Sequence, residues 1–207
     1  MLDPDQRSRD TSSRAGRSCG CPDGPRSGKT VPQTPPDTAP RTPATCIAQP
    51  LTPEAFAPHG DVARPGMGAV KMIREGQVRL SKTEATFPHD VAAPAAALDF
   101  YEVEPSEAPL RATMVERHPF STQMFCPMES GRWLVAVWPD GPEGAPQAFV
   151  AGSGDVVTYR PGLWHHGIVA LDRPATFASL MWKTADGQGD TEFLELPAPV
   201  LIDWPDA

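Results

Sequence analysis

The feature that most constrains the fold is a long succession of short apolar segments divided by turn residues. From Val70 onward, strand-like stretches recur between Pro, Gly, Asp and Ser residues, and no long helical pattern follows. Turn signals at close intervals are typical of antiparallel sandwiches and barrels, whereas strands alternating with helices would indicate βαβ units. The sequence therefore predicts an all-β fold with few short helices.

The predicted strands from residue 98 onward are Leu98–Glu104, Arg111–His118, Gln123–Met128, Arg132–Trp138, Gln147–Val150, Asp155–Arg160, Ile168–Leu171, Thr176–Lys183 and Glu192–Leu196. Before them, Lys71–Ile73 and Val78–Leu80 flank a Glu-Gly-Gln turn and predict a hairpin. The segment Ala92–Ala97 is rich in alanine but contains Pro94, so a helix and a loop are both open.

The amino-terminal part of the chain differs from the rest in composition. As far as about Pro50 it has no aromatic residue and is dense in Ser, Thr, Pro, Gly, Arg and Asp. Such a segment buries too little apolar surface to offset the entropy lost on ordering. We therefore expect residues 1–45 to be disordered and residues 46–207 to form one domain. That domain should open with a strand near Cys46 and a short helix capped by Thr52.

Charge and hydropathy exclude several classes of partner. The formal net charge of -8 argues against a general binder of nucleic acid or of anionic membranes. No apolar run reaches the ~18 residues of a membrane span, and the amino terminus lacks the apolar core of a secretory signal. We therefore expect a cytoplasmic protein whose partner is a small molecule, with no nucleic acid and no membrane involved.

Two polar stretches that lie far apart along the chain predict a site. In ERHPFSTQ, Glu116 and His118 are two positions apart, so on a strand they project to the same side. The stretch GDVVTYRPGLWHH has the pattern of a strand, a Pro-Gly turn and a second strand that presents His165. We expect Glu116, His118, Gln123 and His165 to converge inside a barrel.

These side chains suit two kinds of chemistry. A carboxylate and an imidazole on one face can transfer protons or bind a divalent cation, and a glutamine carbonyl can ligate or orient. If a metal is bound, its ligands would be Glu116, His118, Gln123 and His165; otherwise no cofactor is expected. Taken alone, a Glu-x-His pair is more simply an ion pair at a sheet edge. The second stretch is what favours a site.

The combination of ERHPFSTQMFCPM with VTYRPGLWHHGIVAL resembles the ureidoglycolate lyase family, in which Glu-Arg-His-Pro, Thr-Gln, Phe-x-Pro and Trp-His-His recur. The opening LTPEAFAPHGDV is also similar to that family. The two stretches further resemble the two cupin motifs, although Pro161 and Gly162 are adjacent here. The resemblance implies a cupin-like double-stranded antiparallel β-barrel. It also implies a homodimer that splits ureidoglycolate into glyoxylate and urea in purine and allantoin catabolism.

The resemblance also implies roles for individual residues. A base must take the proton of the substrate hydroxyl, and an acid must protonate the departing nitrogen. Glu116 or His165 would transfer these protons, while His118 and Gln123 would hold the hydroxyl or a bound cation.

Three further residues are expected to contact the substrate. Tyr159 would donate a hydrogen bond to the ureido carbonyl, and Arg160 would pair with the carboxylate, because a guanidinium suits bidentate recognition. His166 is also a candidate substrate contact, although it faces the side of its strand opposite to His165.

The chain departs from the family pattern at three places. Members have Asn-x-Gly where this chain has Arg74-Glu75-Gly76, an Arg near Glu102, and a His in place of Arg160. These departures bear on the identity of the substrate more than on the fold. A non-catalytic cupin module that binds a small carboxylate, and a metal-dependent cupin oxygenase or isomerase, are therefore alternatives.

Overall fold

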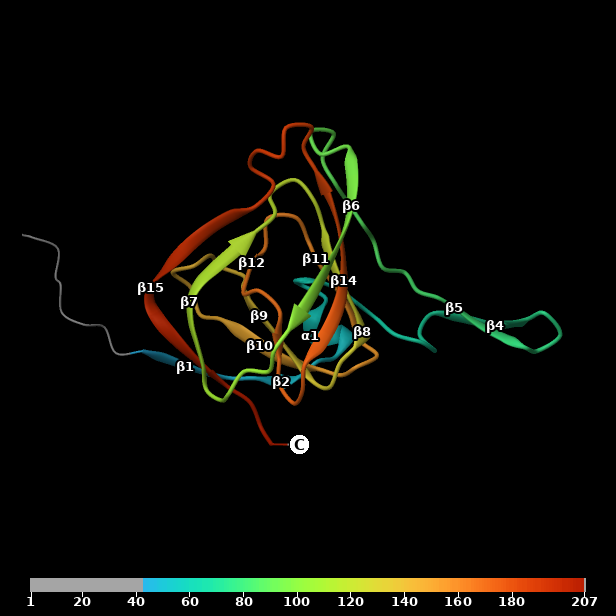
Figure 1. The fold of residues 1–207 in the computed structure, drawn as a ribbon, viewed down its shortest axis with the longest axis horizontal. Helices are drawn as coiled ribbons and strands as arrows, with labels where there is room; N and C mark the ends of the chain where they lie inside the picture. Colours follow the sequence, from blue (N-terminus) through green and yellow to red (C-terminus); the bar gives the residue numbers. More distant parts are fainter. Residues whose placement is uncertain (1–42, 207) are drawn as a thin grey trace, which may run out of the picture. The chain divides into compact units, whose positions relative to one another are not determined.

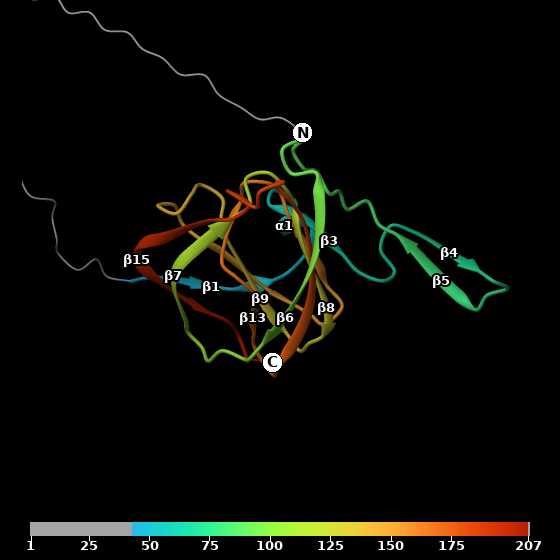
Figure 2. The ribbon, with the colours of Figure 1, turned by 45° about the horizontal axis from the view of Figure 1, so that its top comes forward.

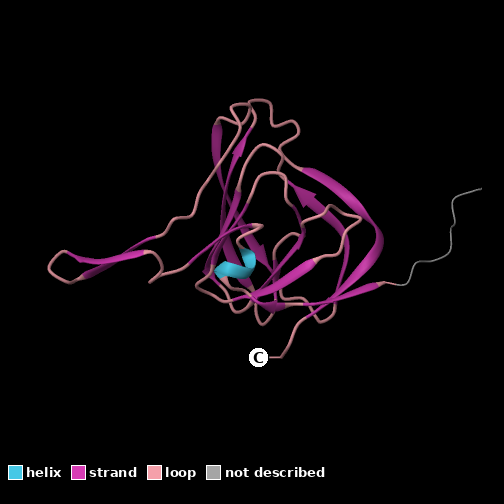
Figure 3. Cartoon of the chain, turned by 180° about the vertical axis from the view of Figure 1, so that it is seen from behind, coloured by secondary structure: helices cyan, strands magenta, loops and turns pink. Residues whose placement is uncertain are grey.

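The structure is a computed structural model that describes residues 43–206. Strands make up nearly all of its regular structure, with one short helix among them (Figure 3). The elements are β1 (Ala44–Ile47), β2 (Gln49–Pro50), α1 (Pro53–Phe56), β3 (Gly60–Ala63), β4 (Ala69–Ile73), β5 (Val78–Lys82), β6 (Ala95–Val103), β7 (Leu110–Arg117), β8 (Gln123–Glu129), β9 (Trp133–Trp138), β10 (Gln147–Ala151), β11 (Val156–Tyr159), β12 (Trp164–His165), β13 (Val169–Ala170), β14 (Ala175–Lys183) and β15 (Glu192–Asp203).

The expectation of disorder for residues 1–45 falls almost wholly outside the described residues. Order is present slightly earlier than expected, because β1 begins at Ala44 and pairs with β15. Within residues 43–206, no helix has the length and apolar character needed to cross a membrane.

Two curved sheets enclose the interior (Figures 1 and 2). The larger has the strand order β1-β15-β7-β12-β9-β10-β2, with β13 also paired to β9, and the smaller has the order β3-β11-β8-β14-β6. The pairs are antiparallel except for β1 with β15 and β10 with β2. The all-β class is confirmed, and the architecture is the double-sheet, cupin-like barrel that the resemblance implied.

Strand β9 forms the centre of the core because every one of its residues is buried. Trp133, Val135 and Val137 belong to the cluster that fills the space between the two sheets. The alternating residues Leu134, Ala136 and Trp138 belong to a second cluster, built from the larger sheet and its adjoining loops. A strand that is apolar on both faces must be covered on both, so the larger sheet curves around β9.

Two local predictions made for the segment before the barrel strands are confirmed. The hydroxyl of Thr52 accepts a 3.2 Å hydrogen bond from the amide of Ala55 and so caps α1. The predicted hairpin forms as β4 and β5, and extends away from both sheets (Figure 1). Its turn places the non-glycine residues Arg74 and Glu75 at positive φ, 49° and 54°.

The end of the segment Ala92–Ala97 is neither the helix nor the loop that the sequence left open. Strand β6 begins at Ala95, and its first residues pair with Lys183, Trp182 and Met181 of β14. Alanine has the highest helix propensity of the residues, but propensities are small, and the strand ladder that β14 offers outweighs them here.

The two-sided packing of the core predicts a large effect from one aromatic substitution. Phe177 is fully buried, and its ring packs edge-on against that of Trp133, with 5.1 Å between the ring centroids. We expect Phe177→Ala to lower the free energy of unfolding by about 3–5 kcal/mol, because it leaves a cavity between the sheets. Denaturant titration followed by circular dichroism measures this. Phe100→Ala is the control, since Phe100 is 62% exposed on the adjacent β6; equal losses would contradict the packing described here.

Candidate active site

Strand register brings the residues of the two polar stretches together. In the larger sheet His165 of β12 lies directly opposite Glu116 of β7, and in the smaller sheet Gln123 of β8 lies directly opposite Tyr159 of β11. Each pair is a cross-strand neighbour, the closest relation that a sheet offers. The sheets face one another, so the two pairs meet inside the barrel.

The side chains of these residues and of His118 form one cluster. Nε2 of His165 lies 3.5 Å from Oε1 of Glu116 and 3.2 Å from Oε1 of Gln123. The ring centroids of His118 and His165 are 5.3 Å apart, and the ring of Tyr159 stacks on that of His165 with a centroid distance of 4.3 Å. The structure thus brings together the acid, the amide and the two imidazoles that the sequence placed at one site.

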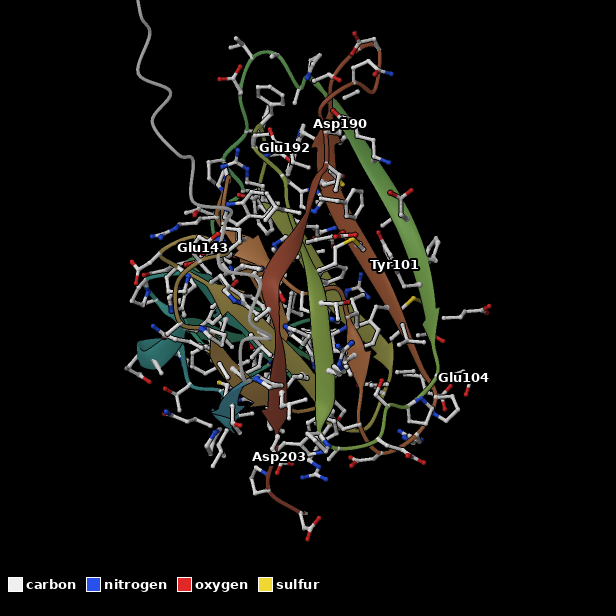
Figure 4. The ribbon with its side chains drawn as sticks, turned by 90° about the vertical axis from the view of Figure 1, so that its left-hand side faces the viewer. Tyr101, Glu104, Glu143, Asp190, Glu192 and Asp203 are labelled. Carbon is white, nitrogen blue, oxygen red and sulfur yellow. The ribbon has the colours of Figure 1, made fainter. Side chains whose placement is uncertain are left out.

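Backbone carbonyls orient both imidazoles. Nδ1 of His165 contacts the carbonyl oxygen of Leu163 at 2.9 Å, and Nδ1 of His118 contacts that of Asp190 at 3.1 Å. A carbonyl only accepts, so both Nδ1 atoms must donate. Asp190 belongs to the loop between β14 and β15 (Figure 4), and its neighbour Thr191 places a hydroxyl 3.2 Å from the same atom of His118.

The opposite nitrogens, Nε2, face the centre of the cluster. Nε2 of His118 is buried and has no hydrogen-bond partner among residues 43–206, and Nε2 of His165 lies near the side-chain oxygens of Glu116 and Gln123. Ligand atoms of Glu116, His118 and His165 all lie within 4.8 Å of one another. A positive charge, either a proton or a cation, is therefore favoured at this point.

Burial and neighbouring charge set the protonation of the cluster. Burial raises the pKa of Glu116, but the hydrogen bond and charge of His165, with the charges of His118 and His166, outweigh it and leave the pKa below its ordinary value. Burial, aided by the charge of His165, lowers the pKa of His118. Burial also raises the pKa of Tyr159, which stays a phenol. At neutral pH the cluster thus presents the carboxylate of Glu116 and the neutral imidazole of His118.

A cavity of about 340 Å³ opens beside the cluster. Three of the predicted residues line it, namely Glu116, His118 and Gln123, whereas His165 lies behind them with no exposed surface. Its other polar lining comes from residues that the sequence did not single out: Asp99, Tyr101, Lys183, Asp190 and Thr191. Asp99 and Tyr101 share one face of β6 by their two-residue spacing, but nothing in the sequence ties that face to Glu116.

Other predicted contact residues lie elsewhere. Arg160 lines a separate cavity of about 240 Å³ together with Asp61 and Thr122. His166 lines a third, of about 270 Å³, which Glu116 also borders. Tyr159 touches His165 but does not line the Glu116 cavity. The substrate contacts predicted for these residues therefore stay predictions.

The sequence of this chain matches that of a known protein family. The profile of the ureidoglycolate lyase family matches residues 43–203, nearly all of the described residues. This chain belongs to the ureidoglycolate lyase family. Relatives named ureidoglycolate lyase include one from Mesorhizobium japonicum, 38% identical over 70% of this chain and 90% of its own length. Another, from Pseudomonas aeruginosa, is 32% identical over 77% of this chain and 96% of its own length.

A solved structure of a dTDP sugar isomerase from Desulfovibrio desulfuricans superposes with a TM-score of 0.42. The two chains are 20% identical, over 68% of this chain and 88% of that one. Membership of the ureidoglycolate lyase family follows from the sequence matches alone.

The hydrogen bond to Asp190 predicts one tautomer for His118. We expect metal-free protein to carry the proton on Nδ1 of His118 at about pH 8, above the ordinary imidazole pKa of about 6.5. Long-range ¹H–¹⁵N correlation spectra distinguish the two ring nitrogens. His89 is exposed and stacks on Trp182, so it serves as the internal reference. A proton on Nε2 of His118 would refute the orientation described here.

Proposed function

We propose that this chain is a lyase that cleaves the C–N bond of ureidoglycolate and releases glyoxylate and urea. Its relatives carry the name of that activity, and it spans nearly their whole length. The observation that carries the proposal is the position of Glu116. Its carboxylate has a pKa held below the ordinary value, lines a cavity, and is backed by two imidazoles.

The reaction needs a proton to move from oxygen to nitrogen. In the proposed mechanism the carboxylate of Glu116 takes the proton of the substrate hydroxyl, and the electron pair of that O–H bond forms the carbonyl of glyoxylate. The C–N bond breaks with its electron pair on nitrogen, which then takes the proton back from Glu116 to complete urea. A single carboxyl group thus acts as base and then as acid.

The buried residues next to Glu116 support its proposed role in proton transfer. His165 stabilises the negative charge on Glu116 between substrates, because its Nε2 is the nearest imidazole atom to that carboxylate. Stacking against Tyr159 and the bond to Leu163 hold its ring in place. His118 and Gln123 line the cavity and are placed to hold the substrate hydroxyl.

The same donors fit a divalent cation. Glu116, His118 and His165 would hold it, with the amide oxygen of Gln123 as a fourth ligand, and the buried unpartnered Nε2 of His118 is the observation that favours this. A bound cation would supply Lewis-acid polarisation of a substrate oxygen. Two imidazoles and one carboxylate also form the ligand set of non-haem iron oxygenases, which keeps a metal-dependent oxygenase as the second candidate.

We further propose that residues 46–207 form the catalytic domain, that two copies form a homodimer, and that the protein acts in the cytoplasm.

The mechanism predicts that Glu116→Gln removes activity and leaves the fold intact. We expect kcat for urea release from racemic ureidoglycolate to fall at least about 100-fold, the lower end of the usual contribution of a positioned base. A coupled urease assay measures the rate, and circular dichroism checks the fold. Glu129→Gln is the matched control on an exposed strand end. Near-normal turnover by Glu116→Gln would reject the assignment.

Metal binding gives an independent prediction. We expect the protein to bind one Mn(II) or Zn(II) per chain and His118→Ala to weaken binding by more than about tenfold, since even outer partners of metal ligands cost that much. Isothermal titration after dialysis against chelator measures the affinity. His89→Ala should bind as the wild type does; equal affinity in both variants would show that the cluster holds no metal.

A further inference from the structure

Among residues 43–206, Lys183 alone places a permanent positive charge on the wall of the Glu116 cavity. It is the last residue of β14, and its ammonium lies 3.0 Å from the carboxylate of Asp99 on β6. Both side chains are partly exposed, 38% and 42%, so they lie where a ligand enters. No role was predicted for either residue.

The rest of the cavity wall would repel an anion. Asp99, Glu116 and Asp190 all contribute acidic side chains to this wall. A substrate that carries a carboxylate needs a cation to offset this field, since like charges at a few ångströms oppose binding. Arg160, the predicted partner, lines a different cavity.

Lys183 has hydrogen-bonding capacity left for a ligand. An ammonium group has three donors, and Asp99 accepts only from one side. That contact restrains the long side chain, so less rotamer freedom is lost when a ligand binds. The pair therefore presents an oriented cation at the entrance of the cavity.

We propose that Lys183 binds the carboxylate of the substrate and sets the preference of the site for anionic substrates. Asp99 is a positioning residue that directs the ammonium. The identity of the substrate rests on the proposed lyase function, but the preference for a carboxylate does not.

The test compares two small probes that differ in charge. Glycolate has a hydroxyl and a carboxylate, and glycolamide has the same hydroxyl beside a neutral amide. We expect wild-type protein to bind glycolate more tightly in isothermal titration. Lys183→Met should weaken glycolate binding by about 10- to 100-fold, the usual value of a charge-assisted hydrogen bond, and leave glycolamide binding unchanged. Lys183→Arg should restore most of the preference.

Two further variants distinguish carboxylate binding by Lys183 from a purely structural role of its ion pair with Asp99. Asp99→Asn removes one negative charge but keeps an amide oxygen that can accept from the ammonium, so Lys183 stays positioned and glycolate should bind at least as well as to the wild type. Lys82→Met, in the β4–β5 hairpin, removes one positive charge away from the cavity and should change nothing. Equal losses in Asp99→Asn and Lys183→Met would overturn the proposal, because only a structural ion pair would then explain both.

The outcomes for the two proposals are distinguishable. If wild-type protein releases no urea from ureidoglycolate, the lyase proposal fails, while the ratio of glycolate to glycolamide affinity still judges Lys183. If it does release urea, Lys183→Met should raise KM by a similar factor and change kcat less, since the carboxylate takes no part in bond breaking. Wild-type protein that shows no preference for glycolate would refute the role of Lys183.

Discussion

The pairing of β12 with β7 is the contact on which the site depends. β12 has only two residues, and β7 and β9 pair with it on either side. Side chains alternate along a strand, so a shift of one residue would turn His165 away from Glu116. The burial of every residue of β9 opposes such a shift, because it would move apolar side chains out of both clusters. Core packing and site geometry are thus fixed by the same register.

The arrangement of the cluster has a cost to stability. Nε2 of His118 is a buried polar atom without a hydrogen-bond partner in the described part of the chain, which is unfavourable for folding. Two oxygens crowd Nε2 of His165, and they favour a positive charge in a place that water does not reach. Such exceptions concentrate at functional sites. Here they mark a point in the barrel where the surroundings favour a proton or a cation.

Local patterns predicted the fold and the centre of the cluster. The two-residue spacing of Glu116 and His118 and the Pro-Gly turn before His165 both depend on neighbours in the sequence, so the sequence alone was enough to find them. For Arg160, the sequence predicts a contact with the substrate carboxylate because a guanidinium suits bidentate recognition. Arg160 follows the last residue of β11 and lines a different cavity, and no local pattern in the sequence indicates which cavity that is.

The remainder of the cavity could not be predicted in this way. Asp99 and Lys183 share a cavity with Glu116 because one sheet packs over the other, and Asp190 joins them from the loop between β14 and β15. That packing depends on total core volume and on no local motif. Ala95 likewise became a strand residue through its pairing with β14. Long-range contacts of this kind need the three-dimensional structure.

The two ends of the barrel domain lie side by side. Ala44 pairs with Val200 and Ile47 with Asp203, in a parallel arrangement at the edge of the larger sheet. Because β1 and β15 run in the same direction, a linker that joined them would have to cross back along the length of one short strand. The exposed tip between β4 and β5 is a natural place for new termini. The chain is therefore suited to circular permutation, in which the strands that carry Glu116, Gln123 and His165 would keep their order.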